Sequence, residues 1–134
     1  MQPQQIHILI VEDNVQNAEL FARILTDYDV LLAHTTTEAI QIAESIPPDL
    51  YLIDFDLPDI HGTHLGLSLK RRMLDGELRT APLIAMTAQN DIESRDNARR
   101  CGFDGFLGKP FTLEMLKTLV HRTLNPHPAT TPQA

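Results

Sequence analysis

The chain has 134 residues, of which 43% are hydrophobic and 22% charged, and these values fit one globular domain with a substantial core. Its formal net charge of -7 provides no general attraction to phosphate backbones, which argues against direct binding of nucleic acid. A single cysteine excludes an intramolecular disulfide and no apolar run reaches the roughly 20 residues of a membrane span, so we expect a cytoplasmic protein without membrane contact.

Short apolar strands alternate with helical patterns along the chain. The predicted strands cover residues 6–11, 30–33, 50–54, 82–87 and 105–107, and a helix is expected after each of them. Alternation of this kind is typical of a parallel, doubly wound α/β sheet. We therefore expect a flavodoxin-like fold with five strands in the order 2-1-3-4-5 and five helices.

Helix ends and inward faces can also be predicted. Asn14 and Thr112 are expected N-caps, and Thr35 with Glu38 has the spacing of a capping box. Apolar spacing places Ala39, Ala43 and Ile46 on one helical face, and Leu65, Leu69 and Met73 repeat at the same spacing. In the last helix, Met115, Leu116, Leu119 and Val120 are predicted to face inward. Residues 1–5 are polar, and the stretch 125–134 is rich in Pro and Thr, so both ends are expected to be disordered.

Polar side chains that could bind a ligand or take part in a reaction follow four of the predicted strands. Glu12 and Asp13 end the first strand, Asp54 ends the third, Thr87 ends the fourth, and Lys109 follows the fifth. In a parallel sheet these strand ends share one edge, which is where open α/β sheets bind ligands. The sequence therefore predicts that three carboxylates, a hydroxyl and an ammonium group converge there.

Electrostatics restricts what such a cluster does. Two carboxylates about 4 Å apart repel each other by about 4 kcal/mol at an effective dielectric constant of 20, so the cluster needs a cation or a proton. Mg²⁺ fits best, because it binds a few carboxylates and is often completed by phosphate oxygens. Asp54 would then be a nucleophile toward a phosphoryl group, with Lys109 and Thr87 stabilising the phosphoryl oxygens.

Four motifs in this order resemble those of one known family. They are residues 9–14, Leu52-Ile53-Asp54 with Pro58 and Gly62 beyond it, residues 85–88, and residues 108–111. The chain resembles a response-regulator receiver domain of two-component signalling, of the single-domain, stand-alone type. The resemblance covers about residues 6–124 and implies the same flavodoxin-like fold.

The resemblance assigns a role to the acidic edge. It implies that Asp54 accepts a phosphoryl group from a histidine kinase or a histidine phosphotransfer protein. It also implies that Glu12, Asp13, Asp54 and the backbone carbonyl of Asp56 hold Mg²⁺. On this reading the protein is not an enzyme beyond its own phosphotransfer and slow autodephosphorylation.

The resemblance also implies a switch. Thr87 and Lys109 would contact the phosphoryl group, and the Lys109–Pro110 bond would be cis. Movement of Thr87 would admit Phe106 inward and reshape the face formed by the fourth helix, fifth strand and fifth helix, which a downstream effector protein would read. The family often has Tyr where this chain has Phe106, which lacks a hydroxyl. Asp56 and Gln89 occupy positions that affect the lifetime of the phosphoryl group.

Three other readings stay open at this stage. Asp54-Phe55-Asp56 imitates the nucleophile motif of haloacid-dehalogenase-type phosphatases, although Pro58 stands where that family has a hydroxyl residue. A phosphate-independent scaffold with the receiver fold is a second alternative. The pair His61-x-x-His64 has the spacing of metal ligands, but no third ligand follows at a matching distance.

Overall fold

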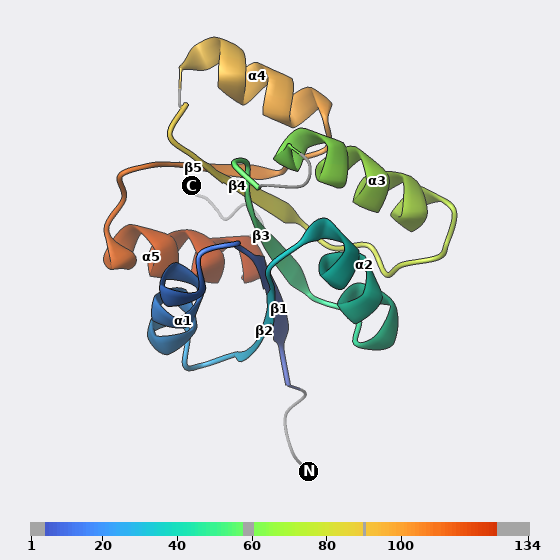
Figure 1. Ribbon diagram of the computed structural model, residues 1–134, viewed down its shortest axis with the longest axis horizontal. Coiled ribbons are helices and arrows are strands. Elements are labelled where there is room, and N and C mark those ends of the chain that lie inside the picture. The colour runs from blue at the N-terminus through green and yellow to red at the C-terminus, as the bar shows by residue number, and fades with distance from the viewer. Residues whose placement is uncertain (1–4, 58–60, 90, 126–134) are drawn as a thin grey trace, which may run out of the picture.

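The computed structural model describes residues 5–57, 61–89 and 91–125, in which strands and helices alternate throughout (Figure 1). The strands are β1 (His7–Val11), β2 (Asp29–Ala33), β3 (Leu50–Asp54), β4 (Leu83–Thr87) and β5 (Gly105–Gly108). The helices are α1 (Val15–Ile24), α2 (Thr36–Ser45), α3 (Gly62–Leu74), α4 (Ile92–Arg100) and α5 (Leu113–Leu124). Each strand lies within one residue of its predicted bounds.

The five strands form one parallel sheet in the order β2-β1-β3-β4-β5. The register pairs Asp54 with Met86 and Thr87 with Gly108, so the carboxyl ends of β3, β4 and β5 are level. The predicted flavodoxin-like fold and strand order are confirmed. This register is what brings the polar strand ends to one edge.

Each face of the sheet has its own hydrophobic core. Helices α2, α3 and α4 contribute buried residues to one core, and α1 and α5 contribute to the other (Figure 1). All residues of β3 and β4 are buried, as expected for central parallel strands that are covered on both faces. The two cores hold the strands rigidly beneath the polar edge.

Side chains that precede the helices satisfy their first backbone N–H groups. Asn14, Thr35 and Thr112 are the N-caps of α1, α2 and α5, as predicted, and each side chain accepts a backbone hydrogen bond. In the predicted capping box, the carboxylate of Glu38 accepts a hydrogen bond from the backbone N–H of His34 at 2.7 Å. These caps start the helices directly beside the polar edge.

Two residues that were expected on the apolar faces of their helices are exposed instead. Ile46 is 39% exposed, because α2 ends at Ser45 and Ile46 has extended backbone angles that no longer follow the helical period. Met115 is 49% exposed, because the buried stripe of α5 runs through Leu116 and Val120. Both predictions were wrong, whereas the other eight residues named with them are buried or partly buried.

Asp104 ties the beginning of β4 to the beginning of β5. Its backbone N–H donates to the carbonyl of Leu83 at 2.7 Å, and its Oδ2 accepts from the N–H of Leu83 at 2.9 Å. The same oxygen lies 3.1 Å from Nζ of Lys70 on α3. Asp104 therefore joins both strands and α3 at the end of the sheet opposite the acidic edge.

Some predictions concern residues outside the described part of the chain. These are Pro58, the residues 1–4 and the residues 126–134. Within residues 5–57, 61–89 and 91–125, no helix has the length and apolar character needed to cross a bilayer.

Candidate functional site

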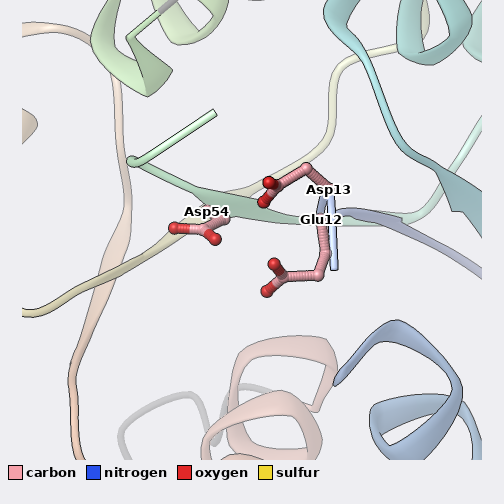
Figure 2. A group of neighbouring side chains, drawn as sticks. All are labelled: Glu12, Asp13 and Asp54. Atoms are coloured by element: carbon pink, nitrogen blue, oxygen red, sulfur yellow. The ribbon is translucent and has the colours of Figure 1, made fainter. Parts of the chain in front are cut away.

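Three carboxylates meet at the carboxyl ends of β1 and β3. Glu12 and Asp13 follow directly after β1, and Asp54 is the last residue of β3. One oxygen from each residue lies within 4.8 Å of the others, and Figure 2 shows the three side chains converging. The predicted acidic cluster is therefore present, and its members come from neighbouring strands.

Glu12 is the most constrained member of this cluster. The residue is 1% exposed; its Oε2 accepts a hydrogen bond from the backbone N–H of Asn14 at 3.2 Å, and its Oε1 has no hydrogen-bond partner among the described residues. Burial, followed by the neighbouring negative charge of Asp54, raises the pKa of Glu12 from 4.5 to about 8. A buried carboxylate oxygen without a partner is costly unless a cation or proton satisfies it.

Lys109 supplies positive charge from the other side of Asp54. Its Nζ lies 3.2 Å from Oδ1 of Asp54, which is only 3% exposed. The Lys109–Pro110 bond is cis, as expected, and the backbone N–H of Lys109 donates to the carbonyl of Thr87 at 2.7 Å. Residues 55 positions apart in sequence thus form a charge-assisted hydrogen bond at the site.

Thr87 and Asp56 are held by short local hydrogen bonds. The buried hydroxyl of Thr87 accepts from the backbone N–H of Gln89 at 3.0 Å. The backbone N–H of Asp56 donates to Oδ1 of Asp54 at 3.0 Å, while the Asp56 side chain is exposed. Oδ1 of Asp54 therefore accepts hydrogen bonds from both Asp56 and Lys109, and neither of these bonds occupies Oδ2.

Phe106 lies half-buried on β5, beside this site. Its ring meets the ring of Phe55 edge-on, with centroids 6.4 Å apart, and the guanidinium carbon of Arg95 lies 5.1 Å from its centroid. Phe106 was predicted as a site residue, but its contact with Arg95 was not. No pattern in the sequence pairs a residue of α4 with one of β5.

The acidic cluster fits a hard divalent cation. Three carboxylates within reach of one another, one of them with an unpartnered buried oxygen, are a donor set that suits Mg²⁺. The alternative histidine pair is not part of it: His61 caps α3 through Nδ1, and His64 is exposed on that helix. Among the described residues, the cluster of Glu12, Asp13 and Asp54 is the one group with metal-binding geometry.

One supporting residue was missed. His34, directly after β2, places its Nδ1 2.9 Å from the backbone carbonyl of Glu12. The position of His34, a polar residue at the carboxyl end of the strand next to β1, could have indicated from the sequence that it lies near the site. This contact orients the backbone that carries Glu12 and Asp13 toward the site.

Comparison with known proteins decides the family. The model of the response regulator receiver domain matches residues 8–121. The chain belongs to this receiver family. It is 32% identical over 108 residues to the polar-differentiation response regulator DivK of Brucella ovis, covering 79% of this chain and 85% of DivK.

Solved structures of receiver domains have the same fold. A two-component response regulator from Clostridium difficile superposes with a TM-score of 0.82 at 28% identity, covering 93% of this chain and 100% of that one. The chemotaxis protein CheY4 of Vibrio cholerae gives a TM-score of 0.80 at 22% identity, covering 90% and 99% of the two chains, and shows the fold alone. The receiver family is a phosphorylation-gated signalling module, and the phosphatase alternative is not favoured.

Proposed function

We propose that this receiver domain takes a phosphoryl group onto Asp54. The observation that carries the proposal is the 3.2 Å contact between Nζ of Lys109 and Oδ1 of Asp54 within a buried acidic cluster. A carboxylate in this position is held on one oxygen by Asp56 and Lys109, and its other oxygen would meet an incoming phosphoryl group. That geometry supports a nucleophile better than a structural cap.

The donor is a phosphohistidine of a histidine kinase or phosphotransfer protein. Oδ2 of Asp54, the oxygen that does not accept from Asp56 or Lys109, attacks the phosphorus. The phosphorus–nitrogen bond breaks, and the ring, already protonated on its other nitrogen, leaves as neutral imidazole. Asp54 then carries an acyl phosphate, which water hydrolyses slowly. No turnover of a separate substrate is involved, so the chain is a signalling module and not an enzyme in the ordinary sense.

Glu12, Asp13, Asp54 and the backbone carbonyl of Asp56 would hold Mg²⁺. When bound, the ion neutralises charge on the phosphoryl oxygens during transfer. Lys109 stabilises the same oxygens with its ammonium group. The exposed side chain of Asp56, together with Gln89, then controls how readily water reaches the acyl phosphate.

Phosphorylation changes a surface through Thr87. Its hydroxyl, now bound to the N–H of Gln89, turns toward the new phosphoryl group, and the vacated space admits Phe106. This changes the face formed by α4, β5 and α5, which an effector protein reads. We assign this behaviour to a receiver domain of residues 6–124 that works in the cytoplasm without direct contact to nucleic acid.

The test is phosphorylation by acetyl phosphate with Mg²⁺, followed by intact-protein mass spectrometry. We expect one added phosphoryl group in the wild type and in the control Asp75→Ala, which changes an exposed aspartate at the end of α3. The addition should disappear in Asp54→Ala and when the metal is chelated. A phosphoryl group that persists in Asp54→Ala would refute the acceptor, and steady release of phosphate from a phosphomonoester would favour the phosphatase reading.

A further inference from the structure

The switch aromatic of this chain needs an anchor other than a hydroxyl. The side chain of Phe106 has no polar atom, so no hydrogen bond can hold its half-buried ring in place. The guanidinium carbon of Arg95 lies 5.1 Å from the centre of that ring. This distance is within the range of an attractive cation–π contact, which is strongest for Arg over an aromatic face.

Arg95 is available for this role. Its side chain is exposed on α4, and none of the ion pairs within the described residues includes it. Its neighbour Arg99, one turn further along α4, is instead paired with Asp96 at 3.3 Å. The ring of Phe106 is therefore the partner that the structure assigns to Arg95.

The inner side of Phe106 offers a competing position. The ring already touches Phe55 edge-on at 6.4 Å, and its partner across the strand pair is the small, buried Ala85. On the opposite side, towards Arg95 and Arg99, a cavity of about 240 Å³ adjoins the ring between α4 and β5. The ring thus lies between the guanidinium of Arg95 on one side and the apolar contacts of Phe55 and Ala85 on the other.

We propose that Arg95 is a positioning residue that holds Phe106 outward and thereby raises the threshold for activation. The inference rests on the proposed function, since it concerns the switch that phosphorylation of Asp54 operates. The cation–π contact exists only while the ring is outward. By linkage, it stabilises the unphosphorylated state and opposes any ligand that prefers the ring inward.

The experiment measures binding of beryllofluoride, a phosphoryl mimic, at saturating Mg²⁺. Loss of an exposed cation–π contact in Arg95→Gln should lower the half-saturating beryllofluoride concentration by about two- to fivefold. Arg95→Lys should give a smaller change, because a lysine ammonium keeps the charge but stacks less well on a ring. Arg99→Gln is the matched control: it removes the same charge from the same helix and should match the wild type.

A double-mutant cycle separates the ring contact from other effects of Arg95. In a Phe106→Ala background, Arg95→Gln should no longer change beryllofluoride affinity. Nuclear magnetic resonance of ring-labelled phenylalanine provides a direct readout. In unliganded Arg95→Gln, the Phe106 signal should move toward its position in the beryllofluoride-bound wild type.

Three results would overturn the inference: equal affinity in the wild type and Arg95→Gln, an effect equal to that of Arg99→Gln, or an effect that persists in Phe106→Ala. Its failure is distinguishable from failure of the proposed function. If the wild type binds beryllofluoride and Asp54→Ala does not, the acceptor role stands and only the role of Arg95 is lost. If Asp54→Ala binds as the wild type does, the proposed function itself fails.

Discussion

At the scale of single residues, the hydroxyl of Tyr51 is a buried polar group. The residue is 0% exposed on β3, and none of the described residues forms a hydrogen bond with its oxygen. Burial raises the pKa of Tyr51 to about 12, so the hydroxyl stays neutral at ordinary pH. It contributes desolvation cost without a compensating bond.

Replacement of this hydroxyl should stabilise the protein. We expect Tyr51→Phe to raise the free energy of unfolding by about 1 kcal/mol, because it removes an unsatisfied buried group and keeps the ring. Urea denaturation measures the change. The control Tyr28→Phe, at a partly exposed tyrosine, should stay within about 0.5 kcal/mol of the wild type. A fall in stability in Tyr51→Phe would contradict this account.

At the scale of elements, α3 packs closely against the ring of Phe103 through a glycine. A Cβ on Gly66 would overlap the ring of Phe103. That ring packs edge-on against Phe55 at 5.1 Å, and Phe55 in turn touches Phe106. Gly66 therefore sets how closely α3 approaches the sheet beneath the switch.

Gly66→Ala should destabilise the protein although alanine is the better helix former. We expect a loss of about 1–2 kcal/mol in the free energy of unfolding, because overpacking of the ring outweighs the gain in helix propensity. His64→Ala, at an exposed position of the same helix, should change it by less than about 0.5 kcal/mol. The two variants are compared by urea denaturation. If Gly66→Ala raised the free energy of unfolding, the ring of Phe103 would have to move aside for the added methyl group at no cost, which would contradict this account.

At the scale of the whole molecule, the raised pKa of Glu12 couples stability, pH and metal. In the folded protein the pKa of the Glu12 carboxyl group is about 8, whereas the ordinary pKa of a glutamate is 4.5. Between these values the folded state binds more protons than the unfolded state, so metal-free stability decreases as pH rises. Mg²⁺ binds the deprotonated cluster, so its stabilising effect should increase over the same interval.

Thermal unfolding at pH 6, 7 and 8, with and without millimolar Mg²⁺, measures this coupling. We expect Tm without metal to decrease across the series and the Mg²⁺-induced rise in Tm to increase. Glu12→Gln cannot lose a proton, so it should remove this part of the pH dependence. A rise in Tm that is the same at all three pH values, or absent, would contradict the assignment of Glu12 to the metal site.

Local sequence patterns predict the strands and the acidic edge of this molecule, but they do not predict its tertiary contacts. The apolar runs that end in Glu12 and Asp54 predict both the strands and the acidic edge, because parallel strands end together. Met115 was wrongly predicted to face inward, because helical spacing alone does not specify which of two neighbouring apolar residues faces the core. The contact of Arg95 with Phe106 depends on how α4 lies over β5, which is a property of tertiary packing.

The bonds of Asp104 have a consequence for movement in the sheet. They join the starting ends of β4 and β5 to each other and to α3, while the site lies at the opposite ends. These bonds oppose sliding of β5 along β4 at that end. On the proposed switch, a displacement of Thr87 is therefore expected to move the outer surface of β5 and α4 more than the starting ends of the two strands. A residue remote from the chemistry would then bias the direction in which the signal leaves the site.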